Sequence, residues 1–392
     1  MNRETKLTEL GRDDAGFVNP PIVRGSTVIF KTREELDTAL KADLKEGPYT
    51  YGLMGTPTER AMEVALAELD GGEATVLLGR GLAAVSVAIM SGVRSGDHLL
   101  MVDTCYSPTR ILCDGMLKDF GVETEYYDPL VSQPGKPPVE SLFRDNTRMV
   151  YMESPGSRTF EMQDVPAIVN ACRERGITSV IDNTWATPLA FRPIEHGADY
   201  VIHALTKYVA GHSDVMLGSV TARTRAGWDK VKMTAVDLGH GCSPDDAWLG
   251  LRGLRSLAAR LDRHESSAMK IAHWLESRPE VRQVLHPALE SHPGHSIWKR
   301  DFDRATGLFG IELHTSDEDA VKRMVEGFSH FKMGYSWGGF ESLMIPLHPD
   351  DGVRTASSKP EGAILRCSIG LEDPDDLITD LESGLYRLQN PA

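Results

Sequence analysis

Short apolar segments alternate with stretches of helical periodicity, and this alternation constrains the fold more than any other feature of the sequence. The apolar segments are only four or five residues long, as strands are, whereas the stretches between them repeat apolar residues at helical spacing. Such alternation predicts βαβ units, in which parallel strands are covered by helices on both faces. We therefore expect an α/β domain with a mostly parallel central sheet. Its strands are predicted at residues 74–78, 98–102, 149–152, 178–181 and 200–203.

The 392 residues exceed what one typical hydrophobic core needs, which favours more than one structural unit. Residues 1–55 carry chain-breaking prolines around one predicted helix at 33–45, which indicates an arm. Residues 56–253 contain the predicted sheet, and a long helix at 246–260 leads into a smaller α/β unit over residues 254–392. The elements predicted in that unit are strands at 308–313 and 364–369 and helices at 320–326 and 376–388.

The composition excludes several classes of function. A formal net charge of −15 argues against a general binder of nucleic acid or anionic membrane, because phosphates favour clustered lysine and arginine. No apolar run approaches the roughly 20 residues of a membrane span, and the first residues lack a secretory signal, so we expect a cytoplasmic protein. Histidine and cysteine show no metal-ligand spacing, so no metal site and reduced thiols are expected. The five cysteines are Cys105, Cys113, Cys172, Cys242 and Cys367.

Four side chains stand at or just after the ends of predicted strands: Tyr106, Glu153, Asp182 and Lys207. Parallel strands place their carboxyl ends along one edge, so one crevice is expected to hold all four. A partly buried lysine can lose its proton and form an imine, and Asp182, after an apolar strand, requires a cationic partner such as a protonated pyridine nitrogen. We therefore predict that Lys207 binds pyridoxal phosphate (PLP) as a Schiff base and that Asp182 pairs with its ring nitrogen.

A glycine loop at residues 79–81 lies between a predicted strand and a helix at 82–91. Glycine allows close approach of the backbone, and the N–H groups at a helix N-terminus attract anions, so this loop is a candidate phosphate site. It matches no full nucleotide-binding motif, and an ordinary connection remains an equal interpretation of the loop alone.

Several longer motifs resemble the Cys/Met-metabolism family of PLP-dependent enzymes, and the resemblance extends from about residue 7 to residue 388. They are the runs 181–188 (Ile-Asp-Asn-Thr-Trp-Ala-Thr-Pro), 206–208 (Thr-Lys-Tyr), 211–214 (Gly-His-Ser-Asp), 153–157 (Glu-Ser-Pro-Gly-Ser), 335–343 around Ser-Trp-Gly-Gly, and 365–372. The last three are most similar to the bacterial cystathionine β-lyase branch. This resemblance implies fold-type I, the aspartate-aminotransferase-like α/β fold, in a homotetramer that shares its sites across a dimer interface.

The resemblance also implies roles for individual residues. Lys207 would bind PLP and move the Cα proton, Tyr106 would stack on the ring, and Tyr51 would reach the phosphate from a neighbouring subunit; these three form the implied catalytic set. The remaining implied contacts are Gly81, Leu82 and Thr206 to the phosphate, Asp182 to the pyridine nitrogen, Arg366 to the substrate carboxylate, and Tyr335, Ser336 and Trp337 along the substrate pocket. For Arg366 an ordinary ion pair is the alternative, and Trp337 taken alone is more typical of a core.

One position departs from the family pattern. The family has a phosphate-binding arginine two residues after the arm tyrosine, whereas this chain has Leu53 there. We hypothesise that Arg80, within the glycine loop, supplies the missing charge; an arginine that points to solvent or to a carboxylate is the alternative. The altered rim at Leu53 and Met54 also leaves the substrate side chain open.

The expected reaction is β-elimination at a carbon–sulfur bond, which releases a thiol, pyruvate and ammonia; from L-cystathionine the thiol is homocysteine. The alternatives are a lyase of other cysteine conjugates or sulfoxides, γ-elimination or replacement, an amino-acid racemase, and a non-catalytic regulatory relative.

Overall fold

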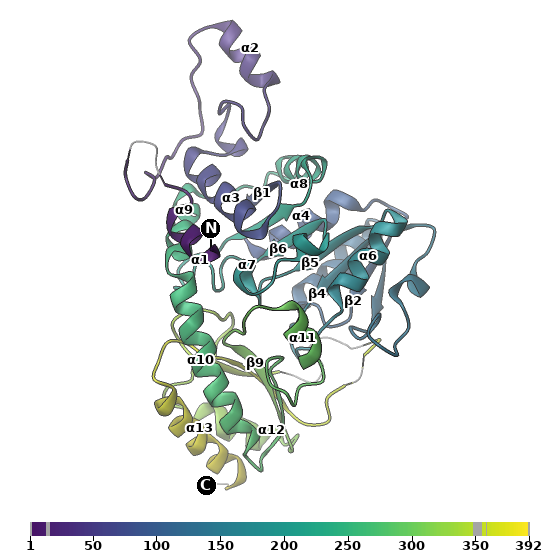
Figure 1. Cartoon of the computed structure of the whole chain (residues 1–392), viewed down its shortest axis with the longest axis vertical. Coiled ribbons are helices and arrows are strands. Elements are labelled where there is room, and N and C mark those ends of the chain that lie inside the picture. The colour runs from purple at the N-terminus through teal and green to yellow at the C-terminus, as the bar shows by residue number, and fades with distance from the viewer. Residues whose placement is uncertain (1, 13–15, 348–354, 358, 391–392) are drawn as a thin grey trace.

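The computed structural model describes residues 2–12, 16–347, 355–357 and 359–390, and two sheets organise it (Figure 1). Residues 1 and 392, the outer bounds of the predicted units, lie outside the described residues. Within the described ranges, no helix is both long and apolar enough to cross a membrane.

The larger sheet has seven strands and confirms the predicted α/β class with a mostly parallel sheet. Only β7 runs against its neighbours, because it pairs antiparallel with both β1 and β6 while the other pairs are parallel. The carboxyl ends of the six other strands therefore meet at one edge. In spatial order the strands are β1 (Ala74–Leu78), β7 (Gly218–Ala222), β6 (Tyr200–His203), β5 (Thr178–Asp182), β4 (Thr147–Glu153), β2 (His98–Val102) and β3 (Glu123–Tyr127).

Helices cover this sheet, and the first of them shows how local sequence sets their bounds. Thr56 caps α3 by accepting from the Glu59 N–H, the Glu59 carboxylate accepts from the Thr56 N–H, and Gly71 ends the helix at a φ of 75°. Such caps satisfy backbone groups that have no partner within the helix. The helices are α3 (Pro57–Asp70), α4 (Gly81–Gly92), α5 (Ser107–Leu112), α6 (Val165–Arg175), α7 (Thr187–Ala190) and α8 (Arg225–Asp237). Shorter helical segments are η1 (Gly52–Met54), η2 (Cys113–Leu117), η3 (Val139–Leu142) and η4 (Pro193–His196).

The smaller unit is built on an antiparallel four-stranded sheet against which helices pack. Its strands, in spatial order, are β10 (Leu343–Leu347), β11 (Ile364–Ser368), β9 (Leu308–Leu313) and β8 (Val281–Leu285). Its helices are α10 (Leu257–Glu276), α11 (His295–Asp301), α12 (Glu318–Glu326) and α13 (Pro374–Gln389). Residues of this sheet and of α10, α12 and α13 form a hydrophobic core separate from that of the larger sheet.

The helix predicted at 246–260 is wrong as a single element. The chain forms α9 (Pro244–Arg255) and then α10, with a break at Ser256, whose φ and ψ are −107° and 5°. The guanidinium of Arg260 donates hydrogen bonds to the backbone carbonyls of Gly253 and Tyr208. A carbonyl group near the end of α9 is thus bound by a side chain that also contacts another segment. Such a partner is not visible in the apolar periodicity.

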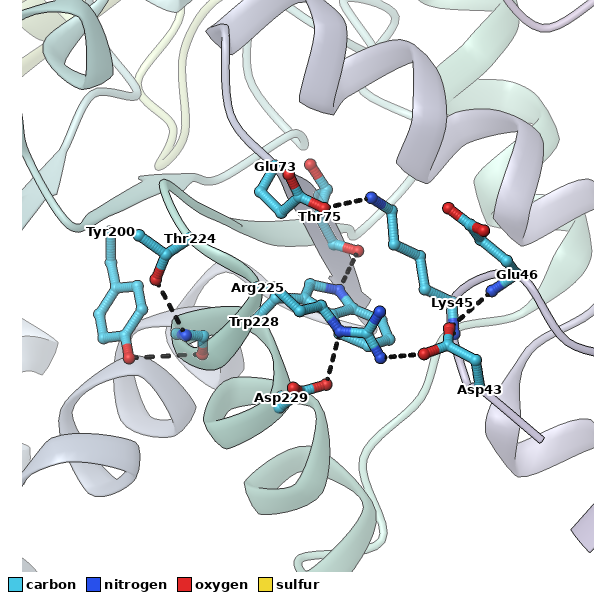
Figure 2. A network of polar contacts seen from close by, with 11 residues as sticks. Asp43, Lys45, Glu46, Glu73, Thr75, Tyr200, Thr224, Arg225, Trp228 and Asp229 are labelled. Carbon is cyan, nitrogen blue, oxygen red and sulfur yellow. Dashed lines mark hydrogen bonds and ion pairs between the residues drawn. The ribbon is translucent and has the colours of Figure 1, made fainter. Parts of the chain in front are cut away.

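The first 55 residues divide into two parts. Helix α1 (Arg3–Glu9) packs against the body through Leu7, which is buried, whereas the following segment with α2 (Arg33–Lys41) projects away from the body (Figure 1). The base of this projection is tied to the body by ion pairs of Asp43 with Arg225 and of Lys45 with Glu73, shown in Figure 2.

Candidate active site

The carboxyl edge of the large sheet brings the predicted crevice residues together. Glu153 and Asp182 end neighbouring strands and are paired in register, Tyr106 follows the end of β2, and Lys207 follows the end of β6. Ser336, which belongs to the smaller unit, also lies at this site, although it is distant in sequence from these four residues.

Lys207 lies at the centre of this group. Its Nζ donates to Oγ of Ser336 at 2.8 Å and lies 5.4 Å from the centre of the Trp337 ring. Burial, together with the charge of Arg366, lowers the pKa of Lys207 to about 8, and the charge of Asp182 opposes this shift. A substantial fraction of the amine is therefore neutral near pH 8, as a nucleophilic or basic lysine requires.

Asp182 is positioned by Thr184. Both hydrogen bonds that Asp182 accepts from the described residues reach Oδ1: one from the Thr184 N–H at 3.0 Å and one from the Thr184 hydroxyl at 2.5 Å. The Thr184 oxygen in turn accepts from the Ala204 N–H, which links the end of β5 to the segment that carries Lys207. Burial raises the pKa of Asp182, so this carboxylate gains from a cationic partner.

Glu153 also belongs to this site. The sequence predicted its position at a strand end but no role for it. It is 8 % exposed, and its Oε2 accepts from the backbone N–H of Tyr106 at 2.7 Å. Burial raises the pKa of Glu153, and the neighbouring Asp182 raises it further. The contact fixes the backbone beneath the Tyr106 ring, which is 43 % exposed at the start of α5.

The glycine loop supplies an open helix N-terminus. Gly81 and Leu82 begin α4, and Arg80 at the cap position makes no side-chain capping bond. A Cβ atom at Gly81 would lie 2.6 Å from Cβ of Ala204, so this close approach requires glycine. Thr206, predicted to bind the phosphate, uses its hydroxyl to accept from the Leu217 N–H and to donate to the Leu217 carbonyl.

The Arg80 side chain is exposed, and its Nη1 donates to the carbonyl of Gly79. Gly241 lies between Leu53 and the glycine loop. A Cβ atom at Gly241 would meet Cδ1 of Leu53 at 3.9 Å, and a Cβ atom at Gly79 would meet the Gly241 carbonyl at 3.0 Å. The compensation of Leu53 by Arg80 stays a prediction. Tyr51 is 53 % exposed on the arm, and its contact with a neighbouring subunit also stays a prediction.

The predicted substrate residues approach Lys207 from the smaller unit. Arg366 on β11 is partly buried and donates from Nη2 to the backbone carbonyl of Ser336 at 3.2 Å. Ser336 adopts a φ of 83°, a conformation rare outside glycine, which holds its hydroxyl toward Lys207. Trp337 packs edge-on against Tyr208 at 5.2 Å, whereas Tyr335 is 89 % exposed.

Comparison with known proteins decides the family. The profile of the Cys/Met metabolism PLP-dependent enzymes matches residues 4–386. The chain belongs to this family. It is therefore a PLP-dependent enzyme of amino-acid metabolism, as the sequence motifs predicted.

Relatives of this Cys/Met metabolism enzyme include proteins named for two activities. A putative cystathionine β-lyase of Rhizobium johnstonii is 46 % identical over 97 % of this chain and 95 % of that protein. Cystathionine β-lyase MetC of Escherichia coli is 39 % identical over 98 % of each chain. An L-alanine/L-glutamate racemase of Wolbachia pipientis is 35 % identical over 99 % of this chain and 98 % of the racemase.

Solved structures agree with the fold-type I prediction. A cystathionine γ-synthase of Xanthomonas oryzae superposes with a TM-score of 0.89 at 32 % identity, covering 99 % of each chain. A cystathionine γ-lyase of Lactobacillus plantarum gives 0.87 at 28 % identity, covering 99 % of this chain and all of the lyase.

The residues of this Cys/Met metabolism enzyme fit PLP at both ends of the cofactor. A partly buried carboxylate at Asp182 suits the pyridinium, an amine of lowered pKa at Lys207 suits the aldehyde, and the uncapped start of α4 at Gly81 suits the phosphate. No group of three metal-ligating side chains is found among the residues that the structure describes.

Proposed function

We propose that this enzyme is a carbon–sulfur β-lyase that cleaves L-cystathionine, or a related cysteine S-conjugate, to a thiol, pyruvate and ammonia. The observation that carries the proposal is the arrangement around Ser336, whose hydroxyl contacts the Lys207 amine while its carbonyl holds the Arg366 guanidinium. One residue thus sets both the proton-transferring group and the carboxylate-binding group. The names of the Rhizobium and Escherichia relatives support the choice of reaction.

Arg366 would bind the α-carboxylate through the paired N–H groups of its guanidinium. This contact orients the substrate so that its Cα proton faces Nζ of Lys207, which removes it in the neutral form favoured by burial. Bound PLP supplies an electron sink for the charge left on Cα. Lys207, now protonated, stands ready to deliver a proton to the sulfur that leaves Cβ.

Asp182, Glu153 and Tyr106 act at the cofactor ring. Asp182 would hold the pyridinium, and Thr184 keeps the carboxylate in place through its two hydrogen bonds. Glu153 holds the Tyr106 backbone, and the Tyr106 ring would stack on the cofactor. The start of α4 would hold the phosphate.

A substrate assay on the purified, PLP-loaded protein tests the proposal. L-cystathionine should give pyruvate and homocysteine in equal amounts, and Lys207→Ala should abolish both the products and the visible absorption of the bound cofactor. Formation of 2-oxobutyrate would instead assign γ-elimination. Inversion of L-alanine or L-glutamate without keto-acid release would assign the activity for which the Wolbachia relative is named.

We also propose a homotetramer, a dimer of dimers, in which the arm meets a neighbouring subunit. The arm supports this proposal because it exposes large apolar side chains, which monomers rarely gather on one projection. Their exposed fractions are 70 % for Phe17, 69 % for Val18, 89 % for Ile29 and 66 % for Leu40. We expect light scattering to give the mass of four chains, and a lower mass when Ile29 and Leu40 are replaced by serine.

The five free thiols suit a reducing compartment, and we propose that the enzyme works in the cytoplasm.

A further inference from the structure

A segment of the smaller unit reaches across to the larger sheet (Figure 1). It belongs to the connection between β10 and β11, of which the structure describes residues 355–357 and 359–363. Close to β11, the N–H groups of Glu361 and Gly362 donate to one carboxylate oxygen of Glu312 on β9, each at 2.9 Å. Residues 355–357, the strap, instead contact a side chain at the end of β2, so the strap joins the two units.

The side chain that the strap binds is Asp103. Backbone N–H groups of Thr355, Ala356 and Ser357 donate to its carboxylate at 2.9–3.2 Å, and the two hydroxyls of the strap donate at 3.2 and 2.8 Å. Successive N–H groups of this kind form a concave anion site, which here holds a carboxylate of the other unit. Burial raises the pKa of Asp103, but the bonds from the strap and from Arg110 lower this pKa below its ordinary value, so the carboxylate is charged.

Asp103 lies at one end of the row of site residues. Four neighbouring strands of the large sheet follow the order β6, β5, β4, β2, and the residues at or just after their carboxyl ends are Lys207, Asp182, Glu153 and Asp103. The smaller unit therefore holds this row at both ends, because Ser336 contacts Lys207 and the strap binds Asp103. Contacts at both ends oppose the relative motion that two joined units otherwise show.

We propose that Asp103 is a positioning residue, which latches the smaller unit across the crevice and thereby fixes the distance between Arg366 on β11 and the side chains of the large sheet. Arg366 has to meet the substrate carboxylate while Cα lies beside Lys207, so a shift of about 1 Å between the units would misplace one of the two groups. This inference rests on the proposed function, because it takes Arg366 as the carboxylate-binding residue.

Two competing roles of Asp103 lead to different expectations. If Asp103 served only the larger unit, through Arg110 and the start of α5 at Tyr106, its loss would weaken the binding of PLP. If it served only the stability of the fold, its loss would lower the melting temperature and leave the binding of ligands unchanged. A latch instead predicts a loss that is confined to ligands with a carboxylate for Arg366.

Glycine and glycinamide separate these roles. Both carry an amine that reacts with PLP, but glycine has the α-carboxylate and glycinamide has a neutral amide in its place. The visible absorption of the cofactor in the PLP-loaded protein reports the binding of either ligand. Asp103→Asn keeps the shape of the side chain and removes its charge. It should raise the dissociation constant of glycine about tenfold or more, that of glycinamide about threefold or less, and that of PLP less than about twofold.

Matched variants control for the strap and for stability. Thr355→Val combined with Ser357→Ala removes the two strap hydroxyls, leaves the larger unit untouched, and should act in the same direction as Asp103→Asn. Asp380 on α13 is the matched control, because its carboxylate also accepts from three successive N–H groups, those of residues 329–331, but within the smaller unit. Asp380→Asn should lower the melting temperature and leave the dissociation constants of both ligands unchanged.

Hydrogen exchange gives a readout that is independent of ligands. The amides of residues 355–357 should exchange at least about tenfold faster in Asp103→Asn than in the wild type, because they lose a charged acceptor. Exchange in Asp380→Asn should be unchanged for these amides. Mass spectrometry of the peptide that contains the strap measures both, and unchanged exchange in Asp103→Asn would contradict the latch.

Equal weakening of glycine and glycinamide, weakened binding of PLP, or unchanged binding of glycine in Asp103→Asn would each overturn the inference and leave the β-lyase proposal intact. If the wild type released no pyruvate from L-cystathionine while its affinity for glycine still depended on Asp103, the β-lyase proposal alone would fail. The two failures are thus distinguishable.

Discussion

Nζ of Lys207 donates a hydrogen bond to Oγ of Ser336 at 2.8 Å, across 129 positions of sequence and between the two structural units. The same serine accepts from Arg366 through its backbone carbonyl. Ser336 therefore couples the position of the Lys207 amine, which is proposed to move the proton, to that of the Arg366 guanidinium, which is proposed to bind the substrate.

Ser336→Ala should lower kcat/KM roughly tenfold to a hundredfold, because Lys207 loses the partner that orients its amine. The dissociation constant of PLP should stay within about twofold, since Ser336 makes none of the predicted contacts to the cofactor. Steady-state kinetics and equilibrium dialysis measure the two quantities, with the exposed Ser266→Ala as the control. A large loss of PLP affinity would show that Ser336 serves the cofactor instead.

The reaction of the PLP-free protein with PLP should follow the titration of Lys207. Only the neutral amine attacks the aldehyde, and the pKa of Lys207 is lowered from 10.5 to about 8. The rate should therefore rise about tenfold per pH unit below pH 8 and level off above it. Removing the nearby charge by Arg366→Leu should move the midpoint upward. Stopped-flow absorbance measures both, and a wild-type midpoint near 10.5 would refute the perturbed lysine.

Arg80→Ala should raise the dissociation constant of PLP about tenfold or more, since one charged hydrogen bond contributes about 1.5–3 kcal/mol. Adding Leu53→Arg to that variant should recover affinity, because the cation returns at the position where the family pattern has one. Fluorescence titration of the PLP-free proteins compares the three. If Arg80→Ala binds PLP as tightly as the wild type, Arg80 does not compensate for Leu53.

Buried histidines of the smaller unit should make the protein less stable in acid. In His286, Nδ1 accepts from the Ala288 N–H and Nε2 contacts the Thr306 carbonyl, so the ring is neutral, and burial lowers its pKa to about 4. Between pH 6.5 and 4 the unfolded chain binds a proton that the folded protein does not. Each such histidine therefore removes about 1.4 kcal/mol of the free energy of unfolding per pH unit as the pH falls.

Denaturant unfolding at several pH values between 4 and 7 measures this slope. His264 and His292 share the lowered pKa of about 4 and add to it. The His286→Asn variant should be less stable than the wild type at pH 7. Its unfolding in this pH range should take up about one proton fewer, so its free energy of unfolding should depend less steeply on pH. An unchanged slope in that variant would mean that His286 titrates in the folded protein.

Much of the cofactor end of the site was predictable because it lies at strand ends. The strands before Asp182 and Lys207 are short apolar runs, and parallel strands bring their carboxyl ends to one edge whatever the loops between them do. Strands without a continuous apolar run were missed. β3 (Glu123–Tyr127) lies at the sheet edge with polar residues, and β7 (Gly218–Ala222) is made of small residues and acquires its place by antiparallel pairing.

The sequence by itself determined the fold class, the family and the cofactor, because these depend on local periodicity and on motifs of fixed spacing. It also led to the expectation that Lys207 binds PLP and that Asp182 pairs with its ring nitrogen. Only the tertiary structure decided which residues meet across the two units. The contact of Ser336 with Lys207 arises when the two units, each with its own core, pack together, and no local pattern encodes such a contact between distant segments.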